Sequence, residues 1–274
     1  YSVIFTCDDF SSTLKKAKEI IPLENTYEND YLYTSFVKPV AYSMDGYYFL
    51  KFNLAYAAIH PLTQEEFLTK YPFLVVFHEK GELIEFRFDV LKRVFLSDKK
   101  EPTIYSNLIA EMSDYFKEHF ECDLIPLNLD FMVNVCKRDE NVKLIAQSMK
   151  LPNGGNAQLD VGNNQEYILP FIGELRSLLN DNQAELEKVP DFREALEQFM
   201  FEMEEMSDYP WIELLWENEI KTRSNRVKFV FNYMNKSYCL IQYYYSNVLI
   251  GMERMNYVIE YIVNHRNDDT TQNE

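Results

Sequence analysis

The feature that most constrains the fold is a pair of aromatic-rich apolar runs between Arg226 and Tyr245, RVKFVFNYMNKSYCLIQYYY. β-Branched and aromatic residues dominate both runs, which is typical of strands. The polar residues Asn235–Ser237 separate the runs and supply turn chemistry, so the stretch predicts a β-hairpin. Neither face of this hairpin is wholly polar, and we therefore expect it to lie inside a sheet. The side chains expected in the core are Phe229, Phe231, Leu240 and Ile241.

An isolated hairpin is only marginally stable, so this one needs further strands or a covering helix. Apolar residues at helical spacing follow it directly, at Met252, Met255, Val258, Ile259 and Ile262. A hairpin followed by a helix is also predicted near residues 37–70, 73–120 and 142–180. The sequence thus predicts an α+β fold with several antiparallel β-hairpins, each followed by a covering helix, in mostly antiparallel sheets.

Local patterns place individual elements. Asp45-Gly46 between two apolar runs predicts a two-residue hairpin. Thr63 with Glu66 forms a capping-box pattern, which predicts a short helix that ends near Tyr71. Pro190 opens an acidic helix to Met206, because proline is tolerated in a first helical turn. The apolar stripe of that helix is Phe192, Leu196, Phe199, Met200 and Met203.

The chain of 274 residues is long enough for one large domain or two smaller ones. We expect a soft boundary near Asp139, between a strand-rich α+β region over residues 1–139 and a hairpin-helix α+β region over 140–264. Residues 265–274 are a polar tail with nothing to bury, and we expect them to be disordered. One continuous domain is the alternative.

The charge balance is strongly acidic, with 27 Lys and Arg against 44 Asp and Glu, or −17 in net charge. Nucleic-acid binding depends on the neutralisation of phosphates by Lys and Arg, so direct binding of nucleic acid is disfavoured. A protein partner with a basic surface fits this charge better. The Asn-, Lys-, Ile-, Tyr- and Phe-heavy usage suggests a bacterial or phage source.

The four cysteines stand far apart, with no metal-binding spacing among them: Cys7, Cys122, Cys136 and Cys239. Free thiols in apolar surroundings are typical of a reducing compartment, so we expect a cytoplasmic protein. No apolar run reaches the ~18 residues that suggest a membrane span, and we expect no membrane association.

The strongest catalytic candidate is the segment HEKGELIEFRFD, residues 78–89. Glu85 and Asp89 project from one face of a predicted strand, with His78 across the turn, and strand carboxylates can hold divalent cations. This predicts, as an alternative, a metal-dependent nuclease or phosphodiesterase. However, Arg87 stands where such enzymes place a lysine, and arginine cannot act as a base. A solvent-facing strand whose charges pair across its face explains the same residues.

Other motifs of catalysis or cofactor binding are missing from the sequence. The chain has only 7 glycines, and Asn153-Gly154-Gly155 lacks the lysine of a phosphate-binding loop. No histidine has a second histidine at i+3 or i+4, and His119 with Cys122 at i+3 is the nearest approach to a ligand set, at a predicted helix end. We therefore expect no cofactor and no metal site.

The aromatic surplus, 20 Tyr and 20 Phe, points to an interaction surface in addition to the core. Aromatic residues are favoured interface anchors. The residues expected at the interface are Trp211, Trp216, Tyr243, Tyr244 and Tyr245. Our leading interpretation is a non-enzymatic acidic protein that acts through protein–protein binding. It would self-associate, serve as a subunit of an assembly, or inhibit a partner by resembling the charge of DNA.

Overall fold

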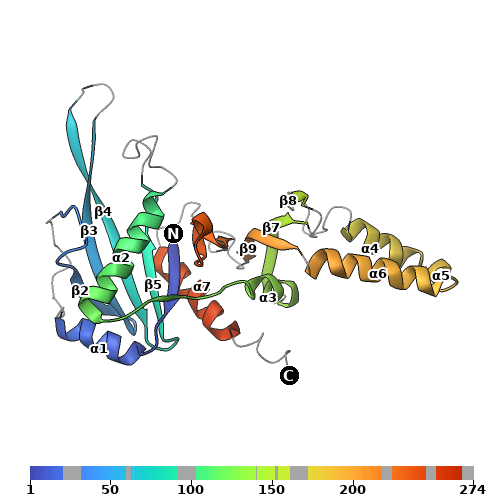
Figure 1. Cartoon of the computed structure of the whole chain (residues 1–274), viewed down its shortest axis with the longest axis horizontal. Coiled ribbons are helices and arrows are strands. Elements are labelled where there is room, and N and C mark those ends of the chain that lie inside the picture. Colours follow the sequence, from blue (N-terminus) through green and yellow to red (C-terminus); the bar gives the residue numbers. More distant parts are fainter. Residues whose placement is uncertain are drawn as a thin grey trace. The chain divides into compact units, whose positions relative to one another are not determined.

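The computed structural model shows a mixed α+β protein whose paired strands run antiparallel (Figure 1). It describes residues 1–20, 32–59, 63, 65–91, 103–139, 141–151, 154–160, 172–205, 207–217, 224–244 and 251–266. The expected tail at 265–274 and Tyr245 therefore lie largely or wholly outside the described residues. Every described helix is too short or too polar to cross a bilayer.

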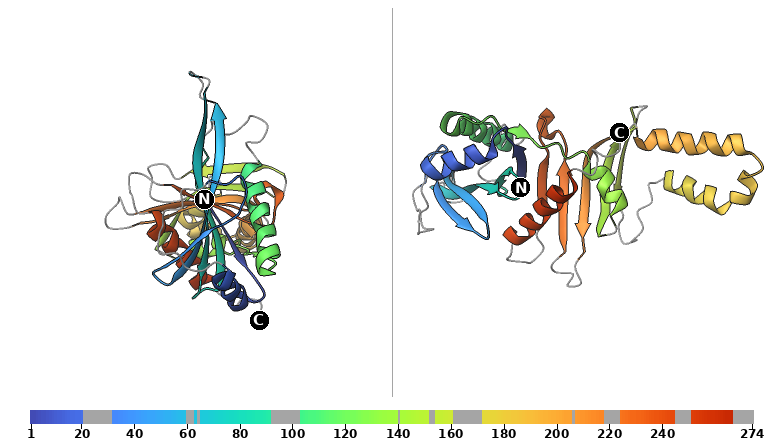
Figure 2. Two further views of the ribbon diagram at one scale, coloured as in Figure 1. Left: turned by 90° about the vertical axis from the view of Figure 1, so that its left-hand side faces the viewer. Right: turned by 90° about the horizontal axis from the view of Figure 1, so that it is seen from below.

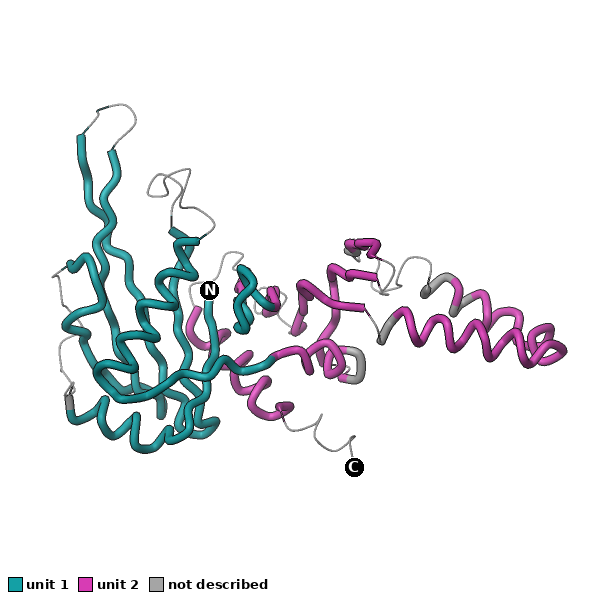
Figure 3. Tube along the Cα trace, viewed as in Figure 1, with its two compact units in different colours: residues 1–128, 232–241 teal, residues 129–231, 242–274 magenta. Residues whose placement is uncertain are grey.

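The chain divides into two compact units (Figure 3). Unit 1 comprises residues 1–128 and 232–241, and unit 2 comprises residues 129–231 and 242–274. The single division predicted near Asp139 falls within unit 2. Each unit has its own helices and strands, described separately below.

Unit 1 contains two helices and the strands of one antiparallel sheet. Its elements are β1 (Ser2–Thr6), α1 (Phe10–Ile20), β2 (Val40–Met44), β3 (Tyr47–Ile59), β4 (Glu66–His78), β5 (Leu83–Phe88), α2 (Ile104–Phe120), β6 (Ile125–Pro126) and a 3₁₀ turn at Tyr233–Asn235. The strand order is β2-β3-β4-β5-β1. β6 pairs with the end of β1, and Ile241 pairs with Ser2.

The predicted turn at Asp45-Gly46 is confirmed. Met44 pairs with Tyr47, and the two turn residues between them have φ values of 53° and 82°. Two positive φ angles are required by the turn type that best matches the twist of a hairpin, which is why glycine is favoured there.

Aromatic packing fastens α1 and α2 to one face of this sheet. Phe116 of α2 lies 6.0 Å from Phe77 and 5.7 Å from Phe86, measured between ring centroids. Phe10 of α1 lies 6.2 Å from Phe77. Because side chains alternate along a strand, β5 directs Ile84, Phe86 and Phe88 to this face and the charged Glu85 and Arg87 to the other.

The short helix predicted between Thr63 and Tyr71 is wrong. That part of the chain forms the first half of β4, which pairs with β3 from Tyr47↔His78 to Ile59↔Glu66. The Thr63 hydroxyl does accept a local hydrogen bond from the Glu65 amide, as a cap would. The continuous pairing with β3 provides many backbone hydrogen bonds, which outweigh one capping interaction.

The elements that lie wholly within unit 2 are α3 (Met132–Arg138), β7 (Val142–Lys150), β8 (Asn156–Asp160), α4 (Ile172–Asp181), α5 (Gln183–Leu186), α6 (Pro190–Glu205), β9 (Asp208–Trp216), β10 (Asn225–Val230) and α7 (Gly251–His265). Its strand order is β10-β9-β7-β8, all antiparallel. The hairpin predicted at residues 142–161 corresponds to β7 and β8, with Gly154 at φ 85° in the turn. Met255, Val258, Ile259 and Ile262 of α7 are buried, as their helical spacing predicted.

The hairpin stretch from Arg226 to Tyr245 forms β10 and β11 (Leu240–Tyr244), with a longer connection than predicted. Residues 232, 234 and 235 have left-handed backbone angles around the 3₁₀ turn, so the chain leaves the strand before the polar Asn235–Ser237. All four side chains expected in the core are buried: Phe229, Phe231, Leu240 and Ile241.

Two antiparallel helices, α4 and α6, with the short α5 at their far end, project from the strands of unit 2 (Figures 1 and 2). We call residues 172–205 the helical arm. Pro190 opens α6, as predicted.

Candidate interaction surfaces

Three charged or titratable residues of the predicted catalytic segment meet inside unit 1. Glu85 Oε2 lies 2.8 Å from His78 Nε2 and accepts a hydrogen bond of 2.7 Å from Arg87 Nη2. The Glu85 side chain is 0% exposed, and those of His78 and Arg87 are each 4% exposed. The expectation of a solvent-facing strand is therefore wrong. β5 is a central strand between β4 and β1, and all six of its residues are buried.

The electrostatics of Glu85 follow from these contacts. Burial by itself would raise the pKa of Glu85, since a buried carboxylate loses its hydration. The Arg87 guanidinium and the hydrogen bond with His78 outweigh burial and lower this pKa to about 2. Glu85 is thus ionised at neutral pH and is held by its neighbours, which indicates a structural ion cluster.

Asp89 does not join this cluster. It is exposed beyond the end of β5, where its Oδ1 accepts a hydrogen bond of 2.7 Å from the Val90 amide. Residues four apart on a strand are separated by about 13 Å, which is too far for two carboxylates to share one cation. Within the described residues, no three His, Cys, Asp or Glu side chains gather in a way that could hold a metal.

The two tryptophans expected at the interface lie in different environments. Trp216 is 3% exposed and packs edge-to-face on Tyr261, with 5.3 Å between ring centroids, in the core of unit 2. Trp211 is half-buried. The physical reason is the period of two along β9, because positions 211 and 216 differ by five and must face opposite ways.

Trp211 belongs to a partly open face of the unit 2 sheet, which we call the aromatic–cationic face. It consists of Trp211, Leu215, Arg226, Lys228, Val230 and Tyr244, all half-buried or exposed. The Lys228 ammonium lies 3.6 Å from the centroid of the Trp211 ring, and the Arg226 guanidinium lies 5.4 Å from that of Tyr244. Arg226 also pairs with Glu213. Tyr243 is half-buried.

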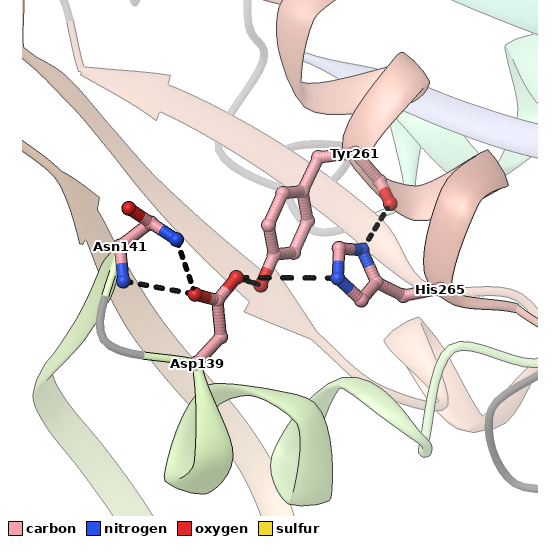
Figure 4. Close-up of polar contacts among 4 residues, drawn as sticks. All are labelled: Asp139, Asn141, Tyr261 and His265. Carbon is pink, nitrogen blue, oxygen red and sulfur yellow. Dashed lines mark hydrogen bonds and ion pairs between the residues drawn. The ribbon is translucent and has the colours of Figure 1, made fainter.

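A polar cluster joins α7 to the segment between α3 and β7 (Figure 4). The Tyr261 hydroxyl donates a hydrogen bond of 2.6 Å to Asp139 Oδ2. Asp139 Oδ1 accepts bonds of 2.9 Å and 2.7 Å from the Asn141 amide and side chain. His265 Nε2 lies 3.9 Å from Asp139 Oδ2.

These contacts shift the pKa values of Asp139 and Tyr261. The hydrogen bond from Tyr261, reinforced by Asn141, lowers the pKa of Asp139. Burial, together with the bond to Asp139, raises the pKa of Tyr261. The cluster is therefore an ionised aspartate held by neutral donors, which fastens α7 within unit 2. Sequence reasoning missed it because 122 residues separate its two main members.

The helical arm has a small apolar seam between its helices. Leu179 and Met200 are buried at its centre, and Leu175, Leu186, Leu196 and Met203 pack around them. Large apolar side chains also stand outside this seam. Phe192 is 59% exposed, Phe199 43% and Phe201 58%.

The arm is also acidic. Between Ile172 and Glu205 the sequence has ten Asp and Glu residues against three Lys and Arg, or −7 in net charge. Two of the cations are engaged within the arm, since Lys188 pairs with Glu185 at 2.6 Å and Arg193 with Glu197 at 2.7 Å. The arm therefore presents exposed phenylalanines on a negatively charged surface.

No known protein-family model matches this chain, and no curated protein sequence matches it.

Proposed function

We propose that this chain is a non-enzymatic, acidic interaction protein whose helical arm contacts a partner protein with a basic surface. The observation that carries the proposal is the exposure of Phe192, Phe199 and Phe201 on an arm of net charge −7. The seam between α4 and α6 uses other side chains, so the folding of the arm does not require these rings. Exposed apolar groups rimmed by charge are characteristic of protein-binding sites.

The net charge of the whole chain supports the choice of partner. At −17, the protein attracts basic surfaces and repels nucleic acid. A subunit of a larger assembly and a DNA-mimicking inhibitor, of bacterial or phage origin, are the two roles that fit such a surface. The free thiols, three of them buried, agree with our proposal of a cytoplasmic location.

A β-hairpin followed by a covering helix forms part of the same proposal, without the instance predicted at residues 37–70, where a strand replaces the helix. Its best-supported instance is the β4–β5 hairpin with α2, since Phe116 packs against Phe77 and Phe86.

Site-specific photo-crosslinking tests the proposed function. A photoreactive phenylalanine analogue replaces Phe199 in the full chain, expressed in the cells that normally produce it. We expect covalent adducts with a defined basic protein, identified by mass spectrometry. The matched control carries the analogue at Lys15, an exposed position in unit 1. Equal adducts at Phe199 and Lys15 would contradict the proposal, as would a lack of adducts at both Phe199 and Phe201 when the analogue replaces each in turn.

An activity assay addresses the alternative of a metal-dependent nuclease or phosphodiesterase. We expect no hydrolysis of DNA, RNA or a small phosphodiester substrate when Mg²⁺ or Mn²⁺ is added. A metal-dependent activity that disappears in Asp89→Asn, at the exposed carboxylate of the same alternative, while Glu79→Gln retains it, would replace the interaction proposal with the enzymatic one.

A further inference from the structure

The helical arm carries a groove of about 500 Å³ between α4 and α6. Its floor is apolar and consists of Leu179 and Met200, both buried. Asn180, Glu194, Glu197 and Phe201 are among the residues that line its sides. The groove thus combines an apolar floor with carboxylates and an exposed aromatic ring along its edge.

Helix geometry separates this groove from the other exposed flank of α6. An α-helix has about 3.6 residues per turn, so Leu196 and Met200 of the seam point in nearly the same direction from the axis of α6, toward α4. Glu194, Glu197 and Phe201 lie on one side of that direction, and Phe192 and Phe199 lie on the other. The two flanks can therefore be altered independently of each other.

We propose that this groove is the docking site for a cationic amphipathic helix of the partner protein. The inference rests on the proposed function and specifies the partner's chemistry. A groove between two antiparallel helices runs along their axes, so a third helix fills it best and completes a three-helix seam. Leucine-like residues at i, i+3 and i+7 would pack on Leu179 and Met200.

Charge complementarity determines which residues should flank the apolar stripe of the partner helix. Among the side chains that the structure describes, Glu194 makes no ion pair and Glu197 pairs with the half-buried Arg193 alone. The two carboxylates lie about one turn apart, or roughly 5 Å along the axis. Lysines or arginines one turn apart on the incoming helix would match them, and they interact favourably at low ionic strength.

A second copy of this chain is a poor occupant of the same groove. Two arms of −7 each repel one another, and the exposed phenylalanines of α6 are interspersed with glutamates. Nucleic acid is repelled for the same reason. The occupant to which we commit is therefore a basic helix from a different protein.

A binding titration of the full chain tests this inference. The probe is a fluorescent 18-residue peptide designed as an amphipathic helix, with a leucine stripe flanked by lysines. We expect saturable binding by fluorescence anisotropy that weakens with added salt. Glu194→Lys with Glu197→Lys should weaken it by about tenfold or more, and Phe201→Ser should also weaken it. A peptide with glutamate in place of lysine should not bind.

Matched variants on the opposite flank are Phe192→Ser and Asp191→Lys, at exposed residues that do not line the groove, and they should leave peptide binding within about twofold of the native protein. Circular dichroism of each variant confirms that the arm retains its helices. Binding that is unaffected by the groove variants, or equally affected by the opposite-flank variants, overturns the groove assignment. No binding of the lysine peptide also overturns it. Phe199 adducts with a basic protein would still support the proposed function in either case.

Discussion

Glu85 illustrates how a charged residue becomes part of a protein interior. Its carboxylate is held between His78 and Arg87 on a strand with both faces buried. Moving charges out of water is costly, and a buried ion cluster recovers that cost only through close pairing. The tight geometry therefore matters for the stability of unit 1, while a role in chemistry would require access that Glu85 lacks.

The substitution Glu85→Gln removes the negative charge with little change in shape. We expect it to lower the free energy of unfolding by about 3 kcal/mol, because the buried Arg87 loses its counter-charge. Urea denaturation followed by circular dichroism measures this. The control is Glu79→Gln, which breaks an exposed pair with Lys18 and should cost at most about 1 kcal/mol. Equal effects of the two substitutions would contradict a structural role for the buried cluster.

At the scale of elements, α7 is attached to unit 2 by both apolar and polar contacts. Val258, Ile259 and Ile262 are fully buried on one stripe of the helix. Tyr261 adds a ring contact to Trp216 and the short hydrogen bond to Asp139. The polar contact depends on the ionisation of Asp139, so the attachment of α7 should respond to pH.

Tyr261→Phe tests this pH dependence. The folded protein lowers the pKa of Asp139, so the stabilisation is fully present above the ordinary aspartate pKa and is lost as pH falls through the folded value. We expect the variant to be less stable by about 1.5 kcal/mol at pH 7, with a difference that shrinks below about pH 4. Denaturant titrations from pH 7 to pH 3 measure it. Tyr257→Phe, at an exposed tyrosine of the same helix, is the control. A difference that stays constant with pH would contradict this account.

At the scale of the whole molecule, the aromatic–cationic face of unit 2 is the surface that we expect to mediate self-association. We expect a two-fold dimer through Trp211 and Tyr244, since closed dimers are the commonest assembly. Such an interface would bury on the order of 1,200–2,000 Å². Copies with a net charge of −17 repel each other, so the association should strengthen as salt screens that repulsion.

Light scattering across a salt series measures this prediction. The double substitution Trp211→Glu, Tyr244→Glu should keep the protein monomeric at every salt concentration. Trp216 is unsuitable for such a test, because it is buried against Tyr261 and its replacement would destabilise the core. Tyr257→Glu, on an exposed part of α7, serves as the control and should still associate. If the native protein stays monomeric at tens of micromolar, the prediction of self-association is wrong, and we would assign these aromatic residues to the interface with a different protein.

Local patterns in the sequence were sufficient to predict many elements. The Asp45-Gly46 turn, the proline that opens α6 and the buried stripe of α7 were all foreseen. These features depend on the backbone angles of a few adjacent residues and on side-chain periodicities of 2 or 3.6 residues. Both can be read from a short stretch of sequence. The acidic character of the arm was equally readable from its residues.

The tertiary structure alone decided which surfaces are exposed and which distant residues meet. Thr63 and Glu66 form a helix-starting pattern, yet pairing with β3 makes residues 66–71 a strand. The sequence could not show that Glu85 is buried or that Trp216 belongs to the core. Nor could it bring Asp139 to Tyr261. Burial and long-range contact depend on how elements pack, and a local sequence pattern constrains only its own stretch of chain.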